Sequence, residues 1–141
     1  MPNHCFNTLH LNEDSLSLIV EKYIRKNERG DKLFDFDLIV PIGNVIDFTE
    51  QRLEKWGTKW VGYDLCIGES TIEFFTAWSP PIPIIKKLAE LHNDHVFRLE
   101  YYETGISFRG IYTSRVGKEG VIVEDKSWIM TDKDYIELGL V

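Results

Sequence analysis

Residues 4–11 alternate between two sides of an extended chain. One side carries Cys5, Asn7, Leu9 and Leu11. The other side carries Phe6, Thr8 and His10. A period of two is typical of a strand with one face toward a core, so we expect a strand over residues 4–11.

A helical period follows this strand directly. Asn12 is a favourable N-cap, and the acidic residues Glu13 and Asp14 suit the positive end of a helix dipole. The apolar residues at helical spacing are Leu16, Ile19, Val20, Tyr23 and Ile24. The basic residues suited to the last turns are Arg25, Lys26 and Arg29. Gly30 can then end the helix, so the pattern predicts a helix over residues 13–30.

Residues 31–57 are less regular. Apolar and acidic residues alternate briefly, which predicts a short strand that Pro41 and Gly43 interrupt. The apolar members of this alternation are Phe34, Phe36 and Leu38. Asp47 and Glu50 resemble a capping box, which predicts a short helix that Gly57 closes. The apolar residues of that helix are Phe48, Leu53 and Trp56.

The rest of the chain returns to a period of two, interrupted by one helix that Pro83 can begin. In the second of these strands the alternation places Trp78 on the same side as Phe74 and opposite Phe75. The expected elements are strands at 59–67 and 71–78, a helix from 83 to about 92, strands at 96–102 and 106–113, a hairpin through 117–120, and a short helix or loosely docked tail at 132–140.

This order of elements predicts the fold class. Without the insert, the chain reads strand, helix, strand, strand, helix, strand, which is the split arrangement of a ferredoxin-like sandwich. We therefore expect an α+β, two-layer fold with an insert after the first helix and an extra C-terminal hairpin. Residues 1–141 would form a single domain, with a core at about 1–113 and a C-terminal extension at 114–141.

Composition narrows the classes of function. The 141 residues carry a net charge of −7, which disfavours nucleic acid and anionic membranes as partners. No apolar run reaches the about 18 residues that span a bilayer. The first residues lack the pattern of a signal peptide. Cys5 and Cys66 lie far apart, which favours a reducing, cytoplasmic setting over a disulfide framework.

Candidate chemistry is sparse. His92 and His95 could share a helix face, but no second ligand pair has a recognisable spacing, and a polar helix end explains both residues. Cys66 lies inside an alternating strand, where we interpret it as a small buried hydrophobe. Glu100 and Glu103 would face opposite sides of a strand. We therefore predict no catalytic residues, no metal site and no cofactor, and expect a protein that is not an enzyme.

Aromatic residues make up 13% of the chain and crowd the predicted sheet. Most of these rings would fill the core between helices and sheet, and the remainder could form a contact patch. The residues we consider candidates for that patch are Trp56, Trp60, Trp78, Tyr102 and Phe108. Two uses are open: an anchor for a protein partner, or a stacking surface for a small ligand, nucleotide or single-stranded nucleic acid on the open face of the sheet.

Several short motifs, taken in order, resemble a known family. They are MPNHCFN at 1–7, WGTKW at 56–60, TAWSPP at 76–81, YYETG at 101–105 and FRG at 108–110. The set resembles the YubB ferredoxin-like domain family over about residues 1–113. This resemblance implies a ferredoxin-like fold and a small protein of the kind encoded on plasmids and phages, and it supplies no catalytic residues.

From the residues and the resemblance together we expect a non-enzymatic protein-interaction module. Its partner would be a protein, with the acidic surface steering the encounter. A mobile-element origin makes antagonism of a host defence system one specific version of this expectation. The oligomeric state stays open at this point.

Overall fold

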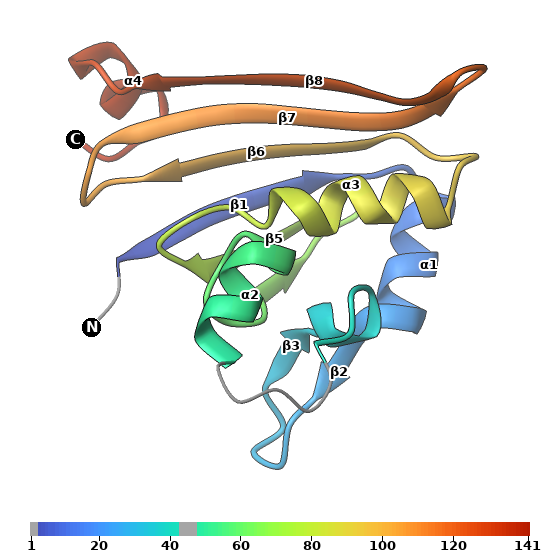
Figure 1. Ribbon diagram of the computed structural model, residues 1–141. Coiled ribbons are helices and arrows are strands. Elements are labelled where there is room, and N and C mark those ends of the chain that lie inside the picture. Colours follow the sequence, from blue (N-terminus) through green and yellow to red (C-terminus); the bar gives the residue numbers. More distant parts are fainter. Residues whose placement is uncertain (1–2, 43–47) are drawn as a thin grey trace.

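Among the described residues, 3–42 and 48–141, six strands form one antiparallel sheet in the computed structural model of the chain (Figure 1). The strands are β1 (His4–His10), β4 (Tyr63–Ile67), β5 (Thr71–Ala77), β6 (Phe97–Glu103), β7 (Phe108–Gly117) and β8 (Gly120–Ile129). Their order across the sheet is β4-β5-β1-β6-β7-β8. β1 therefore lies inside the sheet, where β5 and β6 pair with its backbone N–H and carbonyl groups on both sides.

Helices α1 (Glu13–Tyr23), α2 (Phe48–Trp56) and α3 (Ile82–Leu91) lie on the near side of the sheet, and α4 (Asp132–Glu137) follows β8 at one end (Figure 1). The strands β1, β4, β5 and β6, with α1 and α3 as connections, form the predicted ferredoxin-like unit. The α+β fold class is confirmed. β7 and β8 extend the sheet beyond β6.

The core lies between the sheet and its three helices. Its fully buried apolar side chains include Leu9, Ile72, Phe74, Phe97 and Leu99 from the strands and Ile19, Ile84, Ile85 and Leu88 from the helices. Asn7 is the polar residue on the inner side of β1; its amide donates to the Cys5 carbonyl at 3.1 Å and to Thr76 Oγ1 at 2.9 Å. Because these bonds satisfy the buried amide, the polar residue in the predicted inner face is tolerated.

The predicted helix over residues 13–30 is wrong in its second half. α1 ends at Tyr23, and Ile24–Lys26 forms β2, which pairs with β3 (Lys32–Phe34). The Asn27 side chain accepts two backbone N–H groups of the turn at 2.9 and 3.0 Å, and Gly30 adopts φ 84°. The turn chemistry and the backbone partner on β3 together outweigh the helical spacing of the side chains.

A group of packed aromatic rings joins the insert to β5. Phe34 ends β3, but Phe36–Leu38 forms a 3-10 turn instead of continuing the predicted strand. The Asp35 carboxylate accepts the Asp37 N–H at 3.2 Å and so caps this turn. The rings that pack together here are Phe34, Phe36, Trp56 and Phe74. The predicted capping box at Asp47 and the break at Gly43 lie outside the described residues.

Two predicted strands are too long. β4 begins at Tyr63, not near residue 59, and its register with β5 shifts between Tyr63 and Cys66, where Asp64 adopts φ 52°. β5 ends at Ala77, because Trp78 adopts φ 70°, and the Trp78 side chain is exposed. Cys66 is exposed, so its interpretation as a buried hydrophobe is wrong.

The predicted hairpin through 117–120 is confirmed and is longer than expected. β7 and β8 pair from Phe108 to Ile129 without a shift in register. The predicted core boundary at residue 113 falls within β7, so the hairpin continues the same strand and sheet. The tail contains α4, whose N-cap Thr131 and third residue Asp134 form a capping box. Across residues 3–42 and 48–141, none of the helices is long and apolar enough to cross a membrane.

Candidate functional site

The face of the sheet opposite the three helices carries a continuous row of large side chains. Strand register aligns one residue from each strand in this row. In order across the sheet they are Tyr63, Phe75, Phe6, Tyr102, Arg109 and Trp128. Each is only partly buried, because none of them points into the core beneath α1, α2 and α3. We call Tyr63, Phe75, Phe6 and Tyr102 the aromatic row.

Neighbouring rings of the aromatic row contact one another. Tyr63 and Phe75 stack with ring centroids 6.1 Å apart and an interplanar angle of 27°. Phe75 and Phe6 are 5.3 Å apart at 64°, and Phe6 and Tyr102 are 5.2 Å apart at 41°. These are favourable geometries for cross-strand aromatic pairs, so the open face presents an ordered apolar surface.

Two tryptophans continue this surface from the Tyr63 end of the aromatic row. Trp60 contacts Tyr63 edge to face at 6.3 Å. Lys59 Nζ lies 5.2 Å from the ring of Trp60 and 4.8 Å from the ring of Trp78, which is a double cation–π contact. Trp60 and Trp78 are 38% and 40% exposed. We call Lys59, Trp60 and Trp78 the tryptophan clamp.

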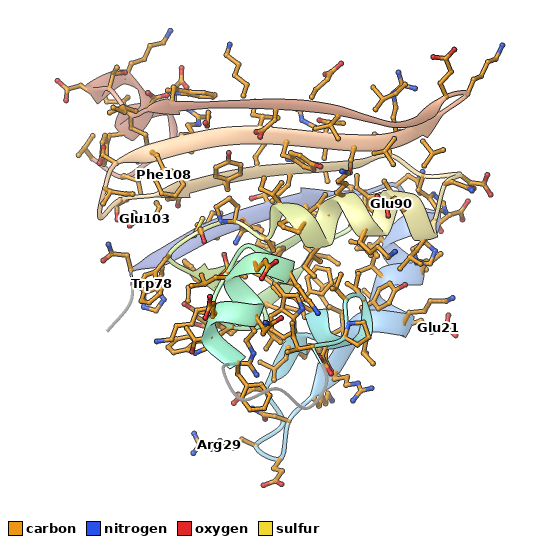
Figure 2. All side chains as sticks on the ribbon, viewed as in Figure 1. Glu21, Arg29, Trp78, Glu90, Glu103 and Phe108 are labelled. Atoms are coloured by element: carbon orange, nitrogen blue, oxygen red, sulfur yellow. The ribbon has the colours of Figure 1, made fainter. Side chains whose placement is uncertain are left out.

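Trp78 reaches the clamp through an unusual backbone conformation. Its φ of 70° lies in the left-handed region, which costs a bulky residue about 1–2 kcal/mol. Its N–H donates to the Asn3 carbonyl at 2.8 Å, and this bond helps to hold the turn in place. Trp78, which follows β5, lies at the same end of the sheet as Phe108, the first residue of β7 (Figure 2). Backbone strain at an exposed aromatic residue is typical of a functional position.

At the other end of the row, α4 is anchored by charge. Arg109 Nη1 donates to Asp134 Oδ1 at 2.9 Å and to Glu137 Oε2 at 3.0 Å. Trp128 Nε1 also donates to Asp134, at 3.2 Å. The Thr131 backbone N–H, with smaller contributions from Trp128 and Arg109, lowers the pKa of Asp134 from 3.8 to about 2. The Arg109 guanidinium is therefore already engaged by two carboxylates.

A groove of about 490 Å³ lies beside the aromatic row. Phe6, Phe75 and Tyr102 form part of its wall, and Leu140 of the C-terminal segment lines it as well. Glu103 lies at its edge, 1% exposed, and accepts the backbone N–H of Ile106 at 3.0 Å. Burial, with a smaller contribution from nearby Glu73, raises the pKa of Tyr102. Tyr102 therefore stays a neutral phenol that can stack and donate a hydrogen bond at neutral pH.

The structure brings three of the five predicted patch residues together. Trp60 and Trp78 share the clamp, and Tyr102 belongs to the row that Tyr63 joins to it.

Trp56 does not belong to this surface. It is 1% exposed and donates its indole N–H to the Val40 carbonyl at 2.7 Å, so the prediction that it contributes to an exposed patch is wrong. Phe108 lies on the helix-bearing side, where its ring meets Tyr101 at 6.0 Å. Trp56 is the buried residue of α2, where its ring packs edge to face on Phe36 at 5.9 Å, whereas Phe48 and Leu53 of the same helix stay exposed.

Three residues of the aromatic row were absent from the predicted patch: Tyr63, Phe75 and Phe6. A signal for two of them was available, because the alternation in β1 and β5 places Phe6 and Phe75 opposite the residues that face the core. What the pattern lacked was the register, which decides that these rings meet in one row.

This surface can form apolar contacts and aromatic stacking interactions. Burial raises the pKa of the Cys5 thiol to about 12, so it stays protonated at neutral pH and is a poor nucleophile. His92 is engaged by the Tyr23 hydroxyl at 2.5 Å. Within the described part of the chain, no group of three or more His, Cys, Asp and Glu side chains is placed to hold a metal ion.

Comparison with known families assigns the chain to one of them. The model of the ferredoxin-like domain in Api92-like protein matches residues 55–136, more than half of the chain. The chain belongs to this family. The family match covers β4 through β8 and most of α4, so it includes the hairpin and tail beyond residue 113. No curated protein and no solved structure matches the chain.

Proposed function

We propose that this domain is a non-enzymatic interaction module that binds a protein partner across the aromatic row and the tryptophan clamp. The observation that carries the proposal is the unbroken series of ring contacts from Trp60 through Tyr63, Phe75 and Phe6 to Tyr102. Aromatic side chains in such an arrangement are the usual anchors of protein interfaces, because they bury large areas at a low cost in side-chain entropy.

Charge indicates the kind of protein that would fit. The net charge of the chain is −7, and Glu73 lies in the row of residues next to the aromatic row, opposite Thr8; Glu100, on the other side of Thr8, already accepts from Arg98 at 2.9 Å. The tryptophan clamp already holds one ammonium group, that of Lys59. A partner segment that combines basic and apolar side chains complements this surface in both charge and shape.

Affinity capture with matched variants tests the proposal. Wild type, Tyr102→Ala and Phe108→Ala would each be used to capture proteins from a bacterial lysate, with quantitative mass spectrometry as the readout. Phe108 is the control because it is a partly buried ring on the opposite side of the sheet. We expect a captured protein whose recovery falls about tenfold with Tyr102→Ala and is retained with Phe108→Ala.

Identical capture profiles for all three proteins would contradict the proposal. Far-UV circular dichroism of each variant separates loss of binding from loss of fold.

A narrower version of the proposal concerns the source of the partner. The resemblance of residues 1–113 to the YubB ferredoxin-like domain family supports a plasmid- or phage-encoded protein acting in the bacterial cytoplasm. A component of a host defence system is then a partner of the expected kind, by association with that family rather than by any contact in the site. Identification of the protein lost with Tyr102→Ala tests this version directly.

A second candidate function uses the same rings as a stacking platform for nucleotides or single-stranded nucleic acid. The observation in its favour is that Phe6, Phe75 and Tyr102 lie on three adjacent strands of a ferredoxin-like sheet, where stacked bases are bound in some RNA-binding domains. Against it, the guanidinium of the same row, Arg109, is engaged by Asp134 and Glu137.

Fluorescence titration distinguishes the two functions. Stacking of bases near Trp60 and Tyr63 would quench emission, and the apparent affinity would fall with added salt. We expect unchanged fluorescence with nucleotides and with oligonucleotides of mixed sequence. Saturable quenching that Tyr102→Ala abolishes would favour the stacking function over a protein partner.

A further inference from the structure

We propose that the free edge of β8 pairs with β8 of a second copy of this chain, antiparallel and centred on Asp125, to form a dimer with one continuous sheet. β8 is the outermost strand and forms the upper rim of the sheet in Figure 1. The proposal concerns an edge of the sheet and does not depend on the function assigned to its open face.

The two edges of the sheet differ in how they are protected. β4 is short, its register with β5 shifts, and Asp64 adopts φ 52° within it, all of which obstruct pairing with a further strand. β8 spans Gly120–Ile129 and pairs with β7 without a shift in register. Exposed apolar residues along it are Ile122, Val123 and Ile129. A long, regular edge of this kind is a template for strand addition.

Backbone geometry fixes which residues of β8 can pair outward. The Met130 N–H donates to the Ser107 carbonyl at 2.7 Å, and these two residues continue the register of β7 with β8. Because hydrogen-bonded pairs alternate along an antiparallel ladder, even-numbered residues of β8 bond to β7. Val121, Val123, Asp125, Ser127 and Ile129 therefore direct their N–H and carbonyl groups away from β7, toward a new strand.

Charge then selects one register for a symmetric pair. Centring the two-fold axis on Glu124 places two glutamates opposite each other, and centring it on Lys126 does the same for two lysines. Centring it on Asp125 places Glu124 of each copy opposite Lys126 of the other. Within the described part of the chain, neither Glu124 nor Lys126 forms a salt bridge; Lys126 is exposed, and its Nζ lies 5.7 Å from the centroid of the Trp128 ring, a contact that leaves its charge unneutralised.

The same register also matches apolar side chains. Ile122 falls opposite Trp128 on the open face, and Val121 falls opposite Ile129 on the other. The Asp125 carboxylates are the one like-charge pair, and their repulsion opposes the favourable pairs. A reversible dimer follows, with the aromatic rows of both copies on the same side of the joined sheet.

Charge reversal with the full chain tests the register. The dissociation constant would be measured by sedimentation equilibrium over about 1 µM to about 1 mM, the range expected of a small reversible interface. We expect Lys126→Glu to weaken the dimer at least about tenfold, because it converts two attractive pairs into repulsive ones. The double variant Glu124→Lys/Lys126→Glu restores the wild-type affinity, and Asp125→Asn strengthens the dimer several-fold.

Proline substitution provides an independent control on the backbone. Asp125→Pro removes an N–H that points away from β7, so we expect a folded monomer. Lys126→Pro removes an N–H that bonds to β7, so it destabilises the hairpin itself. A wild-type chain that is monomeric throughout the concentration range would overturn the proposal. A dimer that Lys126→Glu leaves intact, or that the double variant fails to restore, would overturn it as well.

Discussion

The two faces of the sheet use the same kind of side chain for different purposes. Phe74 and Phe75 are adjacent on β5, yet Phe74 is fully buried against Phe34 and Phe36, whereas Phe75 is partly exposed beside Phe6 and Tyr63. The difference is the helix layer, which covers only one side. Aromatic content alone therefore says little about function until the covered face is known.

The two faces also differ in how polar groups are satisfied. On the covered face, Asn7 forms bonds to Thr76 and to backbone within the core. On the open face, Arg109 is held by two charged partners of α4, Asp134, which is buried, and Glu137, which is exposed. Apolar packing thus holds most side chains of the covered face in place. On the open face, charge and hydrogen bonds position the side chains near α4.

The largest expected effect separates the two phenylalanines of β5. Phe74→Ala leaves a cavity between sheet and insert and should lower the free energy of unfolding by about 3–5 kcal/mol. Phe75→Ala removes ring contacts on the open face and should cost about 1 kcal/mol. Urea unfolding of both variants measures the difference. Equal losses would show that a second layer covers the open face in solution.

A smaller expected effect is a change in stability with pH, caused by Asp134, which anchors α4. The pKa of Asp134 is about 2 in the folded chain and 3.8 as an ordinary aspartate, so its ionised form stabilises the fold above pH 4. This stabilisation is lost as pH falls from about 4 to about 2. Asp134→Asn should therefore melt below wild type at neutral pH and approach it near pH 2.

Thermal melts of wild type and Asp134→Asn across this pH range provide the measurement. A constant difference in melting temperature at all pH values would argue that the carboxylate charge does not contribute. Glu137→Gln is a useful comparison, because Glu137 contacts Arg109 but is more exposed.

The smallest expected effect is a difference in labelling rate between the two cysteines, which lie on opposite faces of the sheet. Cys5 is buried on the covered face and its pKa is raised to about 12, whereas Cys66 is exposed on β4, opposite Glu73. A thiol reagent at pH 8 should label Cys66 rapidly and Cys5 only after denaturation in guanidinium. Rapid labelling of both thiols in the folded chain would mean that the covered face opens readily. Cys66→Ser assigns the fast phase to its residue.

Much of the fold could be predicted because its signals are local. Period-two alternation identified β1 and its inner side, and Asn12 identified the start of α1. The end of α1 could not be found in this way. Ile24 continues the helical spacing, but it forms β2 because Phe34 of β3 offers it a backbone partner ten residues along the chain.

The candidate site was predictable only in part, because it too depends on contacts between residues distant in the sequence. Tyr102 and Trp60 were identified from composition near the sheet, but nothing local shows that Tyr63 joins them. Trp56 and Trp60 are four residues apart and equally aromatic, yet one fills the core and the other is exposed. Which ring is covered depends on the packing of α2 against residues distant in the chain.

The sequence by itself determined the order of the strands and helices of the ferredoxin-like unit, the inner and outer sides of β1 and β5, and the acidic charge of the chain. These features follow from spacing, capping and charge, which act between near neighbours. Only the tertiary structure decided which aromatic residues stay exposed, how strand register aligns Phe6, Phe75 and Tyr102, and that β8 ends the sheet with a free edge. Those depend on contacts between distant segments, which no local pattern encodes.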